Sequence, residues 1–380
     1  MVALGWRLPA KADSQYLVME VANSILANGK CGLFDQNLNS AQQVMACETF
    51  VDGMTDQSAF WAIGCPKEGQ TLEEVRDLML AQVRRLTSGQ WDESLLKAIL
   101  NNMKREQLQA MQSNEQRAER FVDAFVAGQP WSDAVGELQR LDTLSKKTVT
   151  DCARRYLTEG YGCVFKRQGI DASAKKIDKP HISPIETNRD KTSAFVDSVL
   201  AMPVAEVEPV FIDFSREVQK GTLVGGNDLL AHRDADSRLF HLSFVIERGT
   251  KEDPVLAVAE QYLPYLGTDS MDASQLQSRL YALACDATLS TEAGRTRLTL
   301  SGLAENMEEA LRLTERWIAT ARPDTAIYAQ VVNDILKLRA DNKANQKACF
   351  NALVQYGIYG PHNAITDAMD AARMRQLGAA

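Results

Sequence analysis

Alternating apolar and polar positions predict β-strands in both halves of the chain. Apolar side chains occupy every second position at Phe240, Leu242, Phe244 and Ile246. Because successive side chains of a strand point to opposite faces of a sheet, a period of two indicates a strand with one apolar face. The segment 58–64 shows a similar alternation and predicts another strand.

Amphipathic segments with clear start signals predict helices. Thr71 and Glu74 have the spacing of a capping box at the start of the helical segment 71–86. Asp92 and Asp324 each open a further helical segment. An aspartate at that position accepts a hydrogen bond from the free backbone N–H groups of the first turn, so both helices are expected to begin there.

The predicted elements recur in the same order in two regions roughly 235 residues apart. Each region runs from a long amphipathic segment, at 13–29 and at 253–269, through an alternating strand, at 58–64 and at 295–303, to a pair of helices. Several elements in one order indicate a duplicated fold. We therefore predict an α+β protein of two related domains joined by a linker, each domain a mainly antiparallel sheet with helices packed on one face.

Composition sets the predicted domain boundaries. Residues 171–204 are rich in polar side chains and prolines, which is typical of a linker, and 193–202 is predicted to form a short helix. A strand at 161–169 is predicted to close the first domain. The predicted domains are therefore 1–170 and 205–380.

Charge and length restrict the classes of function. The 380 residues carry a formal net charge of -8, which argues against nucleic acid as the main partner, because phosphate binding needs clustered Lys and Arg. No segment approaches the roughly 18 consecutive apolar residues of a membrane span, and the first residues lack the pattern of a secretory signal. Seven cysteines without a C-x-x-C pair favour buried thiols over disulfides or metal ligands.

The residues alone predict no metal site and no catalytic centre in this chain. Protein zinc sites usually need paired His or Cys ligands at short spacing. The four histidines do not pair in this way; they are His181, His232, His241 and His362. The nucleophile pattern G-x-S-x-G and the phosphate-binding pattern G-x-x-x-x-G-K do not occur in the sequence.

The helical segment before Gly267 and Thr268 raises a different possibility. Together with the strand before it and the stretch YLGTDSMDASQLQSRLYALACDATLS around its end, it resembles the opening of one half of the insulinase/pitrilysin family of zinc metallopeptidases. In the active half of that family this helix holds an inverted zinc motif, H-x-x-E-H, followed by a Gly-Thr or Gly-Ser pair. With Gly267 and Thr268 as that pair, the motif falls on Val258, Gln261 and Tyr262.

The resemblance implies that this chain by itself binds no zinc and is inactive. In the family motif, two imidazoles one turn apart hold the zinc and the Glu takes a proton from the metal-bound water. Val258 cannot ligate, Gln261 cannot act as a base, and Tyr262 carries a hydroxyl that is a poor ligand at neutral pH. The third family ligand falls near Asp334, which we expect to be a helix-surface residue. These four positions are thus predicted to be a degenerate zinc motif, without a catalytic or metal role.

Long members of the family have four related domains in two halves that close around a peptide. On that pattern, 1–170 resembles the second domain, 171–204 the linker between the halves, and 205–380 the third domain, truncated at its C-terminal end. The resemblance implies that a zinc-bearing first domain precedes Met1 and that a last domain follows Ala380. The implied partners are these two domains and a peptide substrate.

Three hypotheses follow from the sequence. The leading hypothesis is that the chain is the central, non-catalytic portion of a zinc metalloendopeptidase that degrades peptides in a closed chamber. The alternative is part of a non-catalytic structural or partner subunit related to such peptidases, and the sequence before Met1 would distinguish the two. The third is an unrelated α+β binding protein. Export of the parent to the periplasm is compatible with the resemblance, while unpaired cysteines fit a reducing compartment equally well.

Overall fold

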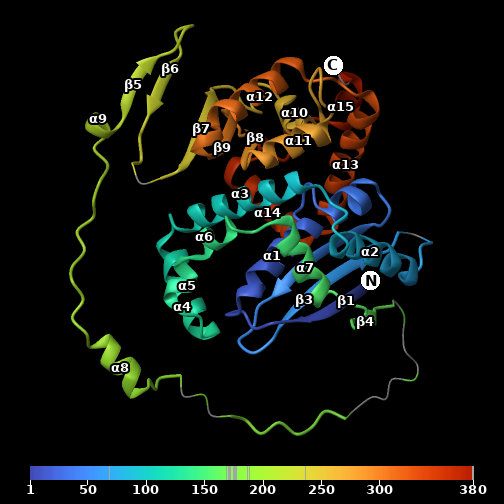
Figure 1. Ribbon diagram of the computed structural model, residues 1–380. Coiled ribbons are helices and arrows are strands. Elements are labelled where there is room, and N and C mark those ends of the chain that lie inside the picture. The colour runs from blue at the N-terminus through green and yellow to red at the C-terminus, as the bar shows by residue number, and fades with distance from the viewer. Residues whose placement is uncertain are drawn as a thin grey trace. The chain divides into compact units, whose positions relative to one another are not determined.

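Figure 1 shows the computed structural model of the protein. It describes residues 1–67, 69–167, 169, 173, 178–185, 187, 189–235 and 237–378. The chain forms two compact units: Met1–Lys166 together with Ser237–Ala380, and Arg167–Asp236. In the first unit, we call 1–166 the first repeat and 237–378 the second repeat.

The first repeat is built on a four-stranded antiparallel sheet in the order β2-β3-β1-β4. The strands are β1 (Val2–Leu8), β2 (Ala46–Asp52), β3 (Ser58–Cys65) and β4 (Gly162–Phe165). In β1 the buried residues alternate strictly with more exposed ones, so one face of the sheet lies against the core. The strands predicted at 58–64 and 161–169 are confirmed as β3 and β4.

Helices α1, α2 and α7 pack against one another and contribute buried residues to the same core as the sheet. The helices of the first repeat are α1 (Ser14–Leu26), the π-helix η1 (Asp35–Ser40), α2 (Leu72–Thr87), α3 (Glu93–Ala110), α4 (Asn114–Ala127), α5 (Trp131–Val135), α6 (Glu137–Leu141) and α7 (Lys146–Tyr156). The predicted capping box is confirmed, since Glu74 N donates to Thr71 Oγ1 at 3.2 Å and Thr71 N donates to Glu74 Oε2 at 2.8 Å.

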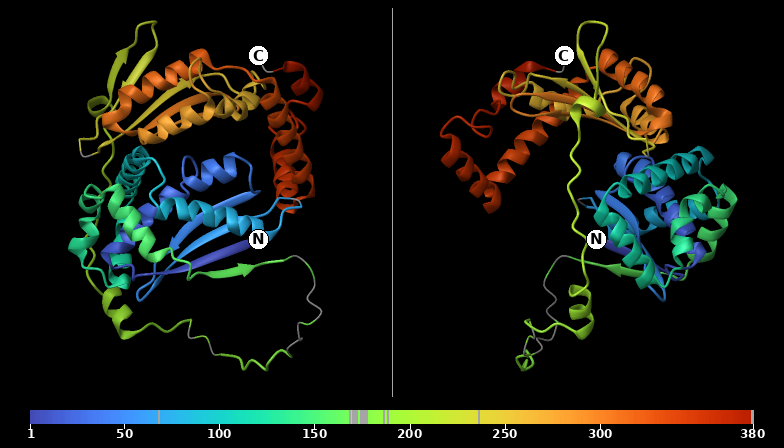
Figure 2. Two further views of the ribbon diagram at one scale, coloured as in Figure 1. Left: turned by 45° about the vertical axis from the view of Figure 1, so that its right-hand side comes forward. Right: turned by 90° about the vertical axis from the view of Figure 1, so that its left-hand side faces the viewer.

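The second repeat contains a three-stranded antiparallel sheet in the order β7-β9-β8. Its strands are β7 (Leu239–Ile246), β8 (Cys285–Thr291) and β9 (Thr296–Leu303). Its helices are α10 (Leu256–Tyr262), the 3-10 helix η2 (Leu263–Tyr265), α11 (Ala273–Ala282), the 3-10 helix η3 (Ala304–Asn306), α12 (Met307–Thr320), α13 (Thr325–Ala344), α14 (Gln346–Tyr359) and α15 (Ala371–Leu377). Figure 2 shows α13 and α14 as two consecutive helices, set at an angle to each other, that project away from this sheet.

The two repeats share one topology. In each, the middle strand (β3 or β9) lies between the strand directly before it (β2 or β8) and the first strand of the repeat (β1 or β7). Each sheet is followed by two long helices, α2 with α3 and α12 with α13. The predicted α+β class, with antiparallel sheets and packed helices, is therefore confirmed.

The second unit, Arg167–Asp236, contains four short elements: α8 (Ala194–Leu200), α9 (Phe214–Glu217), β5 (Gln219–Thr222) and β6 (Asp228–Ala231). Helix α8 confirms the short helix predicted at 193–202. Strands β5 and β6 form a hairpin, and the turn contains two glycines with positive φ. None of the described residues of this unit is buried. The domain boundaries predicted near 170 and 205 stay predictions.

Among the described residues, no helix is both long enough and apolar enough to cross a membrane.

Candidate functional site

Helix α10 is shorter than the sequence predicted, and its start differs. The amphipathic segment 253–269 predicts a helix that Asp253 caps and Gly267 ends, but the α-helix begins at Leu256 and ends at Tyr262. Asp253 instead accepts a hydrogen bond from the backbone N–H of Val255 at 3.1 Å, ahead of the first turn. Because Pro264 has no N–H for the α-helical ladder, the chain continues as the 3-10 turn η2.

Two of the four degenerate-motif positions lie in an apolar cluster. Val258 and Tyr262 are one helical turn apart and have exposed fractions of 4% and 8%. The Tyr262 ring meets the ring of Tyr328 edge to face, with 5.3 Å between centroids. Further residues of α13 complete the contact: Val331, Val332 and Ile335. Where the family motif has two zinc-binding imidazoles, this chain has a packing contact between α10 and α13.

The Tyr262 hydroxyl makes a second link to α13. It donates to the carbonyl of Asp324 at 2.9 Å and accepts from the Asp324 backbone N–H at 2.6 Å. The Asp324 carboxylate in turn accepts from the backbone N–H groups of Ala326 and Ile327, which confirms the predicted cap of α13. Tyr262 therefore holds the N-terminal end of α13 in place, because its one hydroxyl oxygen both donates and accepts a hydrogen bond. A single imidazole nitrogen cannot do both.

The other two positions do not join this cluster. Gln261 is exposed, and its side-chain amide donates to the carbonyl of Ala257 at 3.3 Å. Asp334 is exposed on α13. Across the described residues, no three His, Cys, Asp or Glu side chains are grouped so as to hold a metal ion. The structure thus brings Val258 and Tyr262 together and leaves Gln261 and Asp334 at the surface.

The Gly-Thr pair after the helix forms a tight turn. The backbone N–H of Thr268 donates to the carbonyl of Met271 at 2.7 Å, and a Cβ on Gly267 would lie 2.2 Å from that same carbonyl oxygen. The Thr268 hydroxyl oxygen accepts from the backbone N–H groups of Ser270 and Met271. Glycine at 267 is therefore required by a close backbone approach.

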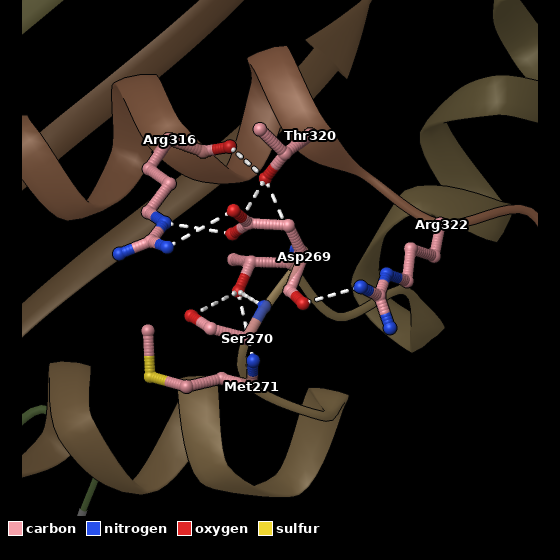
Figure 3. A network of polar contacts seen from close by, with 7 residues as sticks. Asp269, Ser270, Met271, Arg316, Thr320 and Arg322 are labelled. Atoms are coloured by element: carbon pink, nitrogen blue, oxygen red, sulfur yellow. Dashed lines mark hydrogen bonds and ion pairs between the residues drawn. The ribbon is translucent and has the colours of Figure 1, made fainter.

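Asp269 holds this turn against the C-terminal part of α12, as Figure 3 shows. Its carboxylate accepts two hydrogen bonds from the Arg316 guanidinium, at 2.7 and 3.0 Å, and its carbonyl accepts from Arg322. The bond to Arg316 lowers the pKa of the Asp269 carboxyl. Next to this network, the buried indole N–H of Trp317 donates to the carbonyl of Leu266 at 2.9 Å. The turn is thus a structural junction between η2 and α12.

None of the four histidines belongs to this junction. His241 lies on β7, and His232 follows β6 and contacts the Glu217 carbonyl through its Nδ1 at 3.0 Å. His362 lies 3.3 Å from an Asp367 carboxylate oxygen, and His181 is exposed.

Sequence reasoning missed one unusual carboxylic acid, Glu20 on α1. Its pKa is raised to about 7, mainly by burial and then by the nearby charge of Glu137, while Lys11 and a hydrogen bond from Tyr16 act in the opposite direction. The one signal in the sequence is its place next to a buried stripe of α1, at the fourth position after Tyr16. Glu137 is more than one hundred residues away in the chain, so the pairing could not be read from local pattern.

Comparisons with known proteins match the first part of the chain to a family model and its fold to solved structures. Residues 1–103 match the model of the peptidase M16 inactive domain, and no curated protein matches the chain. The crystal structure of pitrilysin covers 99% of this chain and 42% of its own length, at 12% identity and a TM-score of 0.54.

Two bacterial proteases give weaker structural matches. The periplasmic protease PqqL from Escherichia coli covers 100% of this chain and 45% of its own, at 14% identity and a TM-score of 0.36. A protease from Helicobacter pylori covers 43% of this chain and 40% of its own, at 18% identity and a TM-score of 0.41. The chain spans less than half the length of each of these three proteins. The resemblance to the insulinase/pitrilysin peptidases is thus confirmed, because residues 1–103 match the non-catalytic domain of peptidase M16 and the chain has the fold of pitrilysin.

Proposed function

We propose that this chain is the central, non-catalytic portion of a zinc-dependent metalloendopeptidase that degrades peptides in a closed chamber. The observation that carries the proposal is the packing of α10 on α13: the positions aligned with two zinc ligands are Val258 and Tyr262, and both are buried in an apolar cluster. The aligned position of the catalytic base is an exposed glutamine, Gln261. Such a helix preserves the fold and cannot activate water.

In this proposal, the two repeats form part of the wall of the chamber. The catalytic zinc belongs to a further domain of the parent protein. The partners of the chain are then the other peptidase domains and a peptide substrate. The name of PqqL states that it is a periplasmic protease; we propose the same compartment for the parent.

Metal analysis with a peptidase assay tests the proposal directly. The chain is purified without chelator, its zinc content is measured by plasma mass spectrometry, and its hydrolysis of a fluorogenic peptide library is followed. We expect less than stoichiometric zinc and no turnover above buffer. Stoichiometric zinc together with chelator-sensitive hydrolysis would contradict the proposal.

A gain-of-zinc variant tests the alignment of the motif. Val258→His, Gln261→Glu and Tyr262→His are combined in one chain, because positions 258 and 262 lie one turn apart on one face and can direct two imidazoles to one ion. The matched control combines Val258→Ala, Gln261→Ala and Tyr262→Ala, which removes the same packing. We expect zinc binding in the His variant alone. A His variant that keeps its circular dichroism spectrum and binds no zinc would show that the alignment on Gly267 and Thr268 is wrong.

A further inference from the structure

The first repeat contains a cavity of about 210 Å³, lined by residues of the start of α1 and of helices α4, α5 and α6. Figure 1 labels these four helices. Its lining is mixed, with both basic and acidic side chains next to small apolar ones. Leu17, Ala124 and Ala134 form the apolar part. This volume lies below the roughly 300–1,000 Å³ of pockets for drug-sized ligands, so the cavity suits a smaller molecule.

Several of the charged side chains that line the cavity form ion pairs with one another. Lys11 Nζ lies 3.3 Å from an Asp123 carboxylate oxygen, and the Arg120 guanidinium lies 3.2 Å from a Glu137 carboxylate oxygen. Asp13 caps α1. These groups form the frame of the cavity and need no ligand.

Two groups are left with incomplete partners, one of each sign. The Nε atom of Arg140 is buried and has no hydrogen-bond partner within the described ranges. Glu20 has the Tyr16 hydroxyl as a hydrogen-bond partner, and across the described part of the chain no basic side chain forms an ion pair with it. Both groups line the cavity and, within the described ranges, neither forms an ion pair, so each favours a ligand that can supply the opposite charge.

The environment of Glu20 favours a cationic ligand group. Tyr16 faces it from its own helix, Lys11 from the preceding loop, and Glu137 from α6. The charge of Glu137 disfavours ionisation of Glu20, and burial acts in the same direction. A ligand cation placed there would offset both effects, because an opposite charge stabilises the ionised carboxylate.

We propose that this cavity binds a small zwitterion of the amino-acid or short-peptide class, with its ammonium group at Glu20 and its carboxylate at Arg140. Ammonium supplies up to three donors to carboxylate oxygens, and guanidinium supplies the planar donors that a carboxylate accepts. The small apolar lining leaves room for a short side chain. The site lies in the first repeat and does not depend on the proposed role of the chain in a peptidase.

Calorimetric titration of the full chain with the dipeptide L-alanyl-L-alanine tests the proposal. Two analogues isolate the charges: the N-acetyl dipeptide lacks the ammonium group, and the dipeptide amide lacks the carboxylate. We expect saturable binding of the dipeptide near one per chain and binding at least about tenfold weaker for each analogue. No saturable binding of the dipeptide, or equal binding of the amide, would overturn the proposal.

Variants connect the binding to the two residues. Glu20→Gln and Arg140→Gln are each expected to weaken binding at least about tenfold. The matched controls, Glu159→Gln and Arg312→Gln, change exposed residues outside the cavity and should bind as the unmodified chain does. Thermal unfolding of each variant checks its fold. Unchanged affinity in both cavity variants would overturn the proposal.

The pH dependence provides a readout that a loss of fold would not reproduce. Binding of an ammonium group needs ionised Glu20, so affinity should rise about tenfold between about pH 5.5 and about pH 7, where the ligand amine stays protonated. This rise should disappear in Glu20→Gln. A rise that persists in Glu20→Gln would overturn the assignment of the ammonium group to Glu20.

Discussion

Among the single residues, Glu20 couples the stability of the fold to pH. Its folded-state pKa of about 7 lies above the ordinary value of 4.5. The folded state therefore holds a proton that the unfolded state releases between these two values, and the free energy of unfolding falls as the pH rises from about 4.5 to about 7. Above that range the contribution is constant.

The substitution Glu20→Gln should remove this dependence. The amide resembles the protonated acid, so we expect the variant to gain about 2 kcal/mol of stability relative to the unmodified chain when the pH is raised from about 5 to about 8. Urea unfolding at the two pH values measures this difference. Glu159→Gln, an exposed control, should give the same pH profile as the unmodified chain, and an identical profile for Glu20→Gln would contradict the prediction.

Local patterns in the sequence identified the degenerate-motif residues but not their hydrogen-bond partners. Val258, Gln261 and Tyr262 could be singled out because a motif with fixed spacing lies within one short segment. The hydrogen bonds of the Tyr262 hydroxyl could not, because its partner Asp324 is 62 residues away in the chain. Burial and pairing of a side chain depend on such distant contacts, and they decide what the residue does.

At the scale of elements, the turn after η2 makes a sharp prediction about Gly267. A methyl group there would meet the Met271 carbonyl oxygen at 2.2 Å and the Asp272 Cα at 2.8 Å, and both are backbone atoms that cannot move alone. We expect Gly267→Ala to destabilise the chain by about 1–3 kcal/mol, as overpacking of a tight site does. Gly294 has no heavy atom within 4 Å of an added Cβ. Gly294→Ala should therefore leave the midpoint of urea unfolding nearly unchanged, and equal effects of the two substitutions would refute this account of the turn.

The junction of η2 with α12 depends on Trp317. Its side chain is 1% exposed, and its indole N–H satisfies the carbonyl of Leu266. Trp317→Phe keeps an aromatic ring but leaves that carbonyl without its donor, so we expect a loss of about 1–3 kcal/mol in unfolding free energy. Trp131 is 42% exposed, and Trp131→Phe is the control that should lose far less. Comparable losses in the two variants would argue against a special role of the hydrogen bond.

Elements were predictable where their signals are local. The capping box of Thr71 with Glu74 and the cap at Asp324 lie within four residues of the helix start, and both are confirmed. The predicted helix up to Gly267 was wrong because Pro264 interrupts the hydrogen-bond ladder. The missing N–H of this proline outweighs the apolar pattern, which continues past it.

At the scale of the whole molecule, the order of elements in both repeats followed from the sequence because each element carries its own periodicity. Contacts between the repeats did not. The Arg105 guanidinium pairs with the carboxylate of Asp286, and the Asn102 side-chain amide donates to the carbonyl of Tyr281 at 2.7 Å. Nothing in the pattern of α3, α11 or β8 marks these residues as partners, because periodicity identifies the buried face of an element and not what covers it.

The second unit should be the first site of proteolysis. Its described residues are not buried, and it exposes trypsin sites at Arg189 and Lys191. Cleavage requires an accessible segment that can enter the protease, which the buried strands and helices of the repeats do not offer. Brief trypsin treatment followed by mass spectrometry should therefore yield two stable fragments that end and begin within 167–236. Early cleavage inside α1 or α12 would contradict this prediction.

The same cleaved sample tests whether the contacts between the repeats hold without a covalent connection. The Arg105 side chain is only 13% exposed, so its charge would have to be rehydrated or find another partner if the fragments separated. Lys30 Nζ lies 3.2 Å from the same Asp286 carboxylate. We expect the two fragments to elute together in gel filtration at low salt.

Asp286→Lys places a third cation beside Arg105 and Lys30, and repulsion should then separate the fragments, more completely at low than at high ionic strength. The matched control is Asp341→Lys, which reverses an exposed charge within α13 that pairs with Lys337 of the same helix. If the fragments of the unmodified chain elute apart, or if Asp341→Lys separates them as well as Asp286→Lys does, the polar contact around Asp286 does not hold the repeats together.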